Sequence, residues 1–405
     1  MGGGLFQLAA YGIMDKKYLL GNPSNSYFKS IFKKYSNFSS ETKRTYFNTD
    51  FDFGKKIKVT IPKIGDLIMD MYIEIELPKI NSNQNQTVGY INSVALALIK
   101  NIKLKIGDQL IVEHYGDWNN IWSQFTVASE KKICYNNLIG KYGFINSNLD
   151  SEGGIYIVPL HFWFCNNPGL ALPLASLQYH SITLEFELRD FNELWISSDG
   201  NPPIGNYNIK KGILYTENIY LDREERLNFS QNPQTYLIKQ LQVTEYPVRE
   251  RNYNLRINLD FNHPVIELIW IYQRDDIKNK GPELGNDWFN YSKDLTEPHS
   301  EPIISAKLVF NGMDRTEQLS AKYFRLLQPL KKHTSVPDNY IYSFSFSLFP
   351  EINDPNGVCN FSRIDNAELH IELDHQIPKG IIRVYAVNFN ILRFESGMAG
   401  IEYSN

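Results

Sequence analysis

Five stretches of this chain alternate apolar and polar side chains residue by residue, and this pattern constrains the fold more than any other feature. They are residues 69–77, 184–189, 255–261, 342–348 and 368–373. In the first, Met71, Ile73 and Ile75 alternate with Tyr72 and Glu74. Successive side chains of a strand point to opposite sides of a sheet, so a period of two indicates a strand with one buried face. Because turn residues separate the stretches and no regular helices alternate with them, the pattern predicts antiparallel sheets packed face to face.

The composition favours the same all-β class. Among 405 residues there are 25 Tyr and 24 Phe, which suit half-buried pleated surfaces. The 25 Gly and 19 Pro fit many tight turns. At about 150 residues per domain, the length predicts two or three domains.

Two halves of the sequence repeat one order of features. A strand at 102–106, a Gly107-Asp108 turn and an amphipathic helix around 118–125 recur as a strand at 306–310, an Asn311-Gly312 turn and a helix around 319–327. Each half then has an aromatic strand, a Pro/Gly/Asn loop and a closing strand. These are residues 161–164, 166–169 and 184–188 in the first half and 344–348, 354–357 and 369–373 in the second. The repeat predicts two similar all-β domains, with short helices that cover a sheet end.

The expected domain limits follow from this repeat. Residues 1–25 form an N-terminal arm, 26–220 the first domain, 221–234 a linker and 235–405 the second domain. The piece from Gly212 to Tyr220 still looks like a strand. Residues 275–302 form a second irregular segment, and a loop of that length is usually functional or exposed.

Charge and cysteine content exclude several protein classes. The net charge of −4 predicts no direct contact with nucleic acid. Cys134, Cys165 and Cys359 are far apart and odd in number, which fits a reducing compartment and no disulfide framework. There is neither a secretory signal nor a run of 18 apolar residues, so we expect a soluble protein made in the cytoplasm.

No pattern in the chain points to catalysis. His161, His180, His263 and His370 show no metal-binding spacing. Glu185 and Glu187 share the polar face of one strand. We expect them to be solvated surface charges and not the pair of catalytic carboxylates of a glycosidase. We therefore expect no enzyme and assign no catalytic, cofactor-binding or metal-ligating residue and no cofactor. Five N-x-Ser/Thr sequons are expected to be chance matches without a secretory route.

Four long motifs are similar to those of one protein family. They are residues 3–23 (GGLFQLAAYG…YLLGNP), 158–180 (VPLHFWF…NPGLALPL…LQYH), 359–366 (CNFSRIDN) and 385–405 (YAVNFNILR…SGMAG…YSN). They resemble the major capsid proteins of nucleocytoplasmic large DNA viruses, collinearly and over nearly the whole chain. One departure is Lys332-His333-Thr334, which keeps a single histidine where the family often has a pair.

The resemblance implies two tandem eight-stranded jelly-roll β-sandwich domains with short helices in the connecting loops. It implies a structural protein whose homotrimeric, pseudo-hexagonal capsomers tile an icosahedral virion shell after assembly in the host cell cytoplasm. Expected partners are the chain itself, neighbouring capsomers, minor capsid and penton proteins, and an internal membrane beneath the shell, reached by the arm. The alternative is a minor capsid, vertex or receptor-binding (carbohydrate-binding) jelly-roll protein, because one fold serves several functions.

Overall fold

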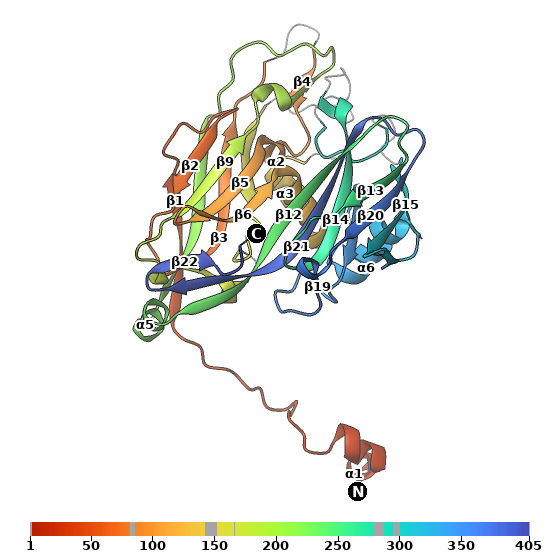
Figure 1. Ribbon diagram of the computed structural model, residues 1–405. Helices are drawn as coiled ribbons and strands as arrows, with labels where there is room; N and C mark the ends of the chain where they lie inside the picture. The colour runs from red at the N-terminus through yellow and green to blue at the C-terminus, as the bar shows by residue number, and fades with distance from the viewer. Residues whose placement is uncertain are drawn as a thin grey trace. The chain divides into compact units, whose positions relative to one another are not determined.

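The chain forms two compact units, Met1–Asn37 and Phe38–Asn405. The computed structural model describes residues 2–81, 86–141, 152–165, 167–278, 287–294 and 300–404. Parts of the predicted irregular segment 275–302 (279–286 and 295–299) and Asn166 of the predicted loop lie outside the described residues. In the second unit, two β-sandwiches lie side by side (Figure 1).

The first sandwich, here called the first roll, contains two main sheets. One has the strand order β1(Phe38–Tyr46)-β11(Lys211–Leu221)-β3(Leu67–Leu77)-β7(Gly154–Pro159), with β8(Leu172–Pro173) also on β3. The other has the order β2(Lys56–Thr60)-β9(Ile182–Leu188)-β5(Ile99–Ile106)-β6(Gln109–Tyr115). A small ladder pairs β4(Val88–Tyr90) with β10(Trp195–Ser197).

The second roll repeats this arrangement strand for strand. Its sheets are β12(Gln234–Val248)-β21(Gly380–Glu395)-β14(Pro264–Arg274)-β18(Ile341–Ser345) and β13(Asn254–Asn258)-β20(Ala367–Leu373)-β15(Ile303–Phe310)-β16(Met313–Asp314). Short strands β17(Leu319–Ser320), β19(Cys359–Asn360) and β22(Met398–Ile401) pair with β15, β14 and β21. All these pairs are antiparallel. Strands that are neighbours in a sheet are often far apart in the sequence, as in Greek-key folds. The predicted double jelly roll is thereby confirmed, while the count of eight strands per roll stays a prediction.

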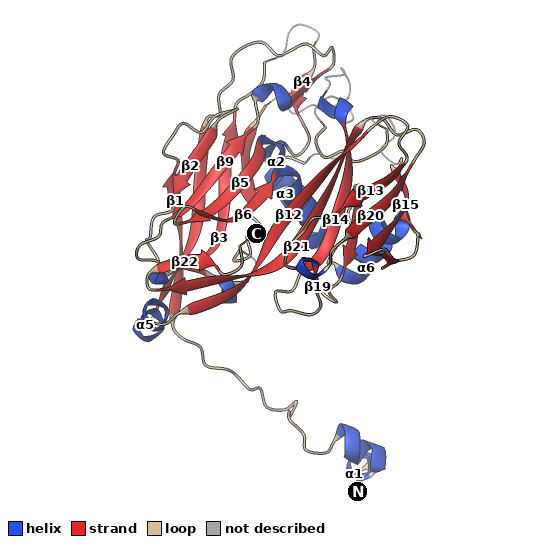
Figure 2. Ribbon diagram, viewed as in Figure 1, coloured by secondary structure: helices blue, strands red, loops and turns tan. Residues whose placement is uncertain are grey.

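Short helices lie before the first strand and between later strands (Figure 2). They are α1(Gly3–Ala9) and η1(Asp15–Leu19) in the first unit, and α2(Val94–Leu98), α3(Gly116–Thr126), α4(Lys132–Ile139), α5(Arg223–Gln231), η7(Tyr323–Leu327) and α6(Gln328–Lys332) in the second. Single 3-10 turns are η2(Ser129–Lys131), η3(Pro168–Leu170), η4(Leu174–Ser176), η5(Phe191–Glu193), η6(Asp275–Lys278) and η8(Phe361–Arg363). No helix in the described part of the chain is long and apolar enough to cross a membrane.

Most of the predicted repeat is confirmed. The strands predicted at 102–106 and 306–310 are β5 and β15, and the closing strands are β9 and β20. The second predicted helix begins later than expected, because Leu319 belongs to β17. The segment 212–220 is β11, a strand of the first roll that pairs with both β1 and β3.

The prediction of an aromatic strand at 161–164 was wrong. These residues form a turn after β7, and β7 is the strand that occupies the position of β18. Phe162, Trp163 and Phe164 are nevertheless buried in the core. Consecutive aromatic side chains can be buried in a turn that packs on the core as well as in a strand. Without an alternating pattern, their hydrophobicity therefore did not distinguish a turn from a strand. Similarly, β18 ends at Ser345, and Leu348 is exposed instead of sharing the inner face.

The hairpin turns at equivalent positions of the two rolls share one backbone geometry. Gly107 and Asp108 have φ of 55° and 65°, and Asn311 and Gly312 have φ of 49° and 79°. Two successive residues with positive φ define the tight hairpin turn whose twist matches that of the strands. Asn and Asp tolerate this region, and glycine adopts it freely.

Replacing Gly312 with alanine is expected to lower the free energy of unfolding by about 1–2 kcal/mol, the cost of holding an L-residue in the left-handed region. A Cβ at this position meets no atom within 4 Å, so the cost comes from the backbone alone. Urea denaturation monitored by fluorescence measures the change. An unchanged midpoint would contradict the assigned turn.

Candidate assembly surfaces and the seam between the rolls

The first roll contacts the second through α3, and we call this contact the seam. Ten residues of α3, from Gly116 to Phe125, are buried. The helix covers β5 and β6, as expected for a helix at a sheet. It also packs against the second roll: the ring of Trp118 lies 5.6 Å from that of Tyr385 in β21. The sequence gives no sign of this second contact, because it joins residues far apart in the chain.

A buried ion pair crosses the seam. The guanidinium of Arg383 in β21 donates to the carboxylate of Asp117 in α3. It donates further to Gln273 Oε1 at 2.6 Å and to Glu245 Oε1 at 2.7 Å. The side chains of Asp117 and Arg383 are only 7% and 16% exposed. Burial lowers the pKa of Arg383, but attraction to Asp117 and Glu245 outweighs it and raises the pKa above its ordinary value.

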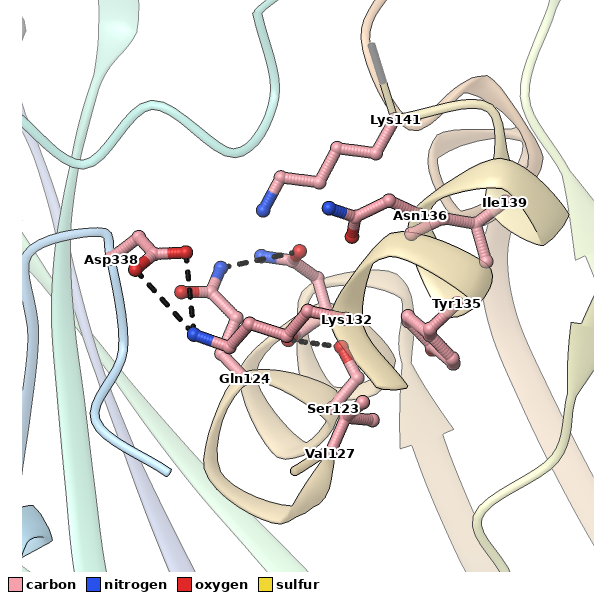
Figure 3. Close-up of a pocket in the computed structure, with 10 residues that line it drawn as sticks. Ser123, Gln124, Val127, Lys132, Tyr135, Asn136, Ile139, Lys141 and Asp338 are labelled. Carbon is pink, nitrogen blue, oxygen red and sulfur yellow. Dashed lines mark hydrogen bonds and ion pairs between the residues drawn. The ribbon is translucent and has the colours of Figure 1, made fainter. Parts of the chain in front are cut away.

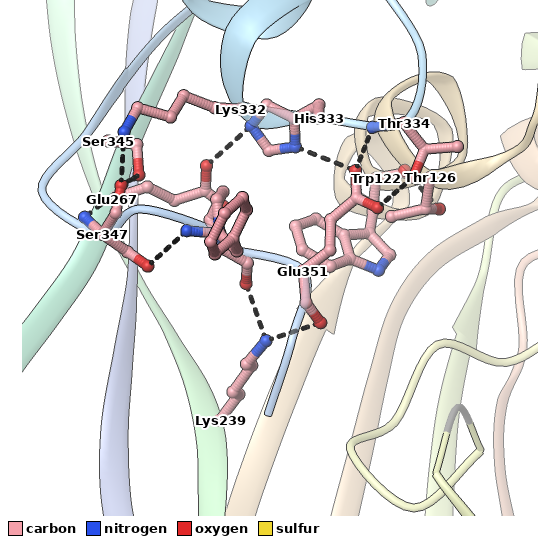
Figure 4. Close-up of polar contacts among 12 residues, drawn as sticks. Trp122, Thr126, Lys239, Glu267, Lys332, His333, Thr334, Ser345, Ser347 and Glu351 are labelled. Carbon is pink, nitrogen blue, oxygen red and sulfur yellow. Dashed lines mark hydrogen bonds and ion pairs between the residues drawn. The ribbon is translucent and has the colours of Figure 1, made fainter. Parts of the chain in front are cut away.

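A second buried cluster centres on His333, just after α6 (Figure 4). Its Nε2 lies 3.0 Å from Oε2 of Glu267, and its Nδ1 lies 3.1 Å from Oε1 of Glu351. Two carboxylates beside one imidazole favour its protonated form. Burial lowers its pKa, but the two carboxylates outweigh burial and raise it to about 9. Lys239 Nζ donates to the backbone oxygens of Pro350 and Glu351, and burial lowers its pKa to about 8.

The His333 cluster is joined to the seam. The imidazole ring lies 4.3 Å from the ring of Phe125 in α3, and Ser335 N donates to the backbone oxygen of Phe125 at 2.9 Å. The side chains of His333 and Glu267 are 0% exposed. A histidine and a carboxyl group whose side chains have no solvent contact therefore lie where the loop after α6 meets the first roll.

The seam is closed at its edge by α4 (Figure 3). Lys132 Nζ lies 3.4 Å from Oδ2 of Asp338 in the second roll, over a cavity of about 20 Å³. A second cavity of about 50 Å³, lined partly by His114 and His161, also lies between the rolls. Such volumes accommodate a few water molecules and not a substrate. The seam therefore holds the two rolls together, and these two cavities do not bind a ligand of metabolite size.

The structure separates the residues that were weighed for chemistry. His161 lies near Tyr135, His180 contacts the backbone of Ala399 across the rolls, and His370 pairs with Glu368. Among the described residues, no three His, Cys, Asp or Glu side chains are grouped to hold a metal ion. Glu185 forms ion pairs with Lys58 and Lys105, and Glu187 with Lys56 and Lys100. The assignment of no site residue stays a prediction.

Two of the places where apolar side chains are exposed bear on assembly. The first unit exposes Leu5, Phe6, Leu8, Tyr11, Ile13, Met14, Tyr18, Leu19, Leu20, Tyr27, Phe28, Ile31, Phe32 and Tyr35, and it also carries five lysines. In the second roll, η7 and α6 expose Leu326, Leu327 and Leu330 by 39%, 37% and 69%. We call these three residues the leucine ridge. Exposed apolar groups of this kind mark contact surfaces.

Comparisons with known proteins agree with this architecture. Residues 26–222 match the family model "Major capsid protein N-terminus", and residues 225–400 match "Large eukaryotic DNA virus major capsid protein". The major capsid protein of Pyramimonas orientalis virus is 35% identical, and that of Paramecium bursaria Chlorella virus 1 is 32% identical, each with 100% of both chains covered.

Solved structures show the same fold. A chain of the "PBCV-1 virus capsid, quasi-atomic model" superposes with a TM-score of 0.80 at 28% identity, covering 94% of this chain and 100% of that one. The "Faustovirus major capsid protein", at 14% identity, shares the fold with a TM-score of 0.78 over 92% of this chain and 93% of its own. The chain thus belongs to the family of large eukaryotic DNA virus major capsid proteins, and its role is structural, in the virion capsid.

Proposed function

We propose that three copies of this chain form a pseudo-hexagonal capsomer and that such capsomers tile an icosahedral shell. The observation that carries the proposal is the pair of rolls with identical strand order, joined by a buried seam. Three copies then supply six similar sides, and cyclic closure of one contact makes the trimer. Weaker contacts between capsomers extend the lattice.

The proposal also covers partners and the absence of catalysis. The protein catalyses no reaction; in support, Glu185, Glu187 and His370 are held in ion pairs within their sheets. The N-terminal arm, residues 1–25, reaches minor capsid and penton proteins or an internal membrane beneath the shell. Its exposed apolar side chains, together with Lys16 and Lys17, suit such a contact. We retain 26–220, 221–234 and 235–405 as the limits of the first roll, linker and second roll, and the host cytoplasm as the place of assembly.

Light scattering after size-exclusion chromatography is expected to give three times the chain mass of 47.0 kDa. Negative-stain images of the same fraction should show particles with a hexagonal outline. A chain that stays monomeric across the micromolar range would contradict the proposal. A trimer that forms only a faint band among virion proteins would favour a vertex component over the main shell protein.

A further inference from the structure

Equivalent sheets of the two rolls are covered unequally. In the second roll, β14 is buried on both faces from Val265 to Gln273, and its buried residues are apolar apart from Glu267 and Gln273. In the first roll, its counterpart β3 buries one face, while Asp70, Tyr72 and Glu74 on the other face remain partly exposed. Strands covered on both sides are apolar on both faces, and strands covered on one side alternate. Among the described residues of the second unit, the outer face of β3 is therefore less covered than that of β14.

The cover in the second roll is a helix of the first roll. There α3 lies on β21, with Trp118 against Tyr385 and Asp117 against Arg383. By position in the repeat, α3 follows the β5–β6 hairpin, and the segment η7–α6 follows the β15–β16 hairpin. The second roll therefore carries an element at the same place in its strand order, and in the described part of the chain its leucine ridge stays exposed.

We propose that the leucine ridge of one copy packs on the outer face of β3 and β11 in the first roll of the next copy. This inference rests on the proposed trimer and identifies the surfaces that close it. This contact has the same arrangement as the seam, because in both a helix of one roll packs on a sheet of the neighbouring roll. Each copy donates one ridge and receives one, so in a closed ring of three copies every ridge and every receiving face is covered.

The receiving face offers apolar area at its centre. Tyr72 of β3 and Tyr215 of β11 stack at 4.9 Å and are only half-buried. Stacked aromatic rings present a flat, rigid surface that leucine side chains cover with little loss of conformational entropy. Glu74 binds the hydroxyl of Tyr215 and Lys211 and so holds this surface in place.

The charges of the two surfaces are complementary. Asp70 and Glu217 lie opposite each other on the receiving face, and among the described residues no lysine or arginine forms an ion pair with either. Like charges directly opposite in a sheet repel each other, so a cation from outside the chain would stabilise them. The segment that carries the ridge also exposes two cations, Lys322 and Lys331.

This polarity is the reverse of that in the seam. In the seam the helix provides the acid, Asp117, and the sheet provides the base, Arg383. In the proposed contact the helix provides the bases and the sheet the acids. The reversal disfavours a helix on the wrong sheet, because like charges would meet, and so keeps the two kinds of contact distinct.

Replacing Leu326 and Leu330 with glutamate is expected to shift the trimer to monomers. It places carboxylates against Asp70 and Glu217 and removes the apolar contact. The protein concentration for half-assembly should rise by about a hundredfold or more, as for residues central to an interface. The matched control is Leu227→Glu, an exposed leucine on α5, which should leave assembly unchanged. Circular dichroism and the unfolding midpoint of the monomer check that the variant is folded.

A charge exchange tests the pairing directly. Lys331→Glu alone and Glu217→Lys alone should each weaken assembly, and the double variant should recover at least part of the loss. Assembly recovers in the double variant only if residues 331 and 217 are in contact. Within one chain these two residues lie on different rolls, so the contact would be between copies. Isotope-labelled and unlabelled copies, mixed and treated with a zero-length carbodiimide, should give cross-links from Lys331 to Glu217 or Asp70 between copies.

The outcomes separate this inference from the proposed function. If the unmodified chain is monomeric, the proposed trimer itself fails. If the trimer persists in the Leu326→Glu and Leu330→Glu variant, with no recovery and no such cross-link, the ridge is not the contact while the trimer stands.

Discussion

Replacing Arg383 with methionine is expected to lower the free energy of unfolding by about 3 kcal/mol, the lower end of the range for breaking a buried ion pair. Methionine retains most of the volume, so the loss is mainly electrostatic. The variant leaves the carboxylate of Asp117, 7% exposed, without its partner. Arg189 lies near enough to attract Asp117, which keeps the loss at the lower end.

The control for this variant changes Glu245, a second partner of the same guanidinium. Glu245 also accepts a hydrogen bond from Arg383, but its side chain is 56% exposed. Glu245→Gln should change the free energy of unfolding by less than about 1 kcal/mol, as for exposed pairs. Asp117→Asn added to Arg383→Met should recover part of the loss, because it removes the unpaired charge. Urea denaturation at fixed protein concentration measures all four proteins; equal effects of Arg383→Met and Glu245→Gln would contradict a buried pair at the seam.

Raising the pH from 6.5 to 8 is expected to lower the free energy of unfolding by about 2 kcal/mol through His333 alone. Its pKa is raised from 6.5 in the unfolded chain to about 9 in the fold. Over this range the folded state keeps a proton that the unfolded state loses. The contribution of His333 is thus fully present below pH 6.5 and is lost as the pH rises through 9.

Lys239 changes the dependence of the free energy of unfolding on pH at higher pH. Its pKa is lowered from 10.5 to about 8, so between these values the unfolded state binds the extra proton and stability rises with pH. From pH 8 to 9 the two effects oppose each other, and above pH 9 only the rise remains. Between pH 6.5 and 10.5 these two groups together therefore give the lowest stability between pH 8 and 9.

Two variants separate the contributions. In His333→Gln the fall between pH 6.5 and 8 should disappear, and the protein should be less stable at pH 6.5 because Glu267 loses its cation. In Lys239→Met the fall should continue to pH 9. Urea denaturation at half-unit pH steps and constant salt gives the profiles. A His333→Gln profile with the wild-type slope would show that His333 is not the titrating group.

The sequence by itself determined the architecture. Alternation in β3, β9 and β20 is a local property of the chain, since each strand buries one face whatever its partners are. The turn types at Asp108 and Asn311 are likewise encoded in single residues that tolerate positive φ. The long motifs then identified the family, and from them followed the double jelly roll and the shell role.

Only the tertiary structure decided how the rolls meet. The Arg383–Asp117 pair joins residues 266 apart in the chain, and no local pattern signals such a partner. The same holds for the charge of His333, which depends on Glu267 and Glu351 from separate segments. The turn at 161–164 was misjudged for a related reason: burial against distant elements, not local periodicity, accounts for its aromatic side chains. Periodicity depends on neighbours in sequence, whereas the seam depends on neighbours in space.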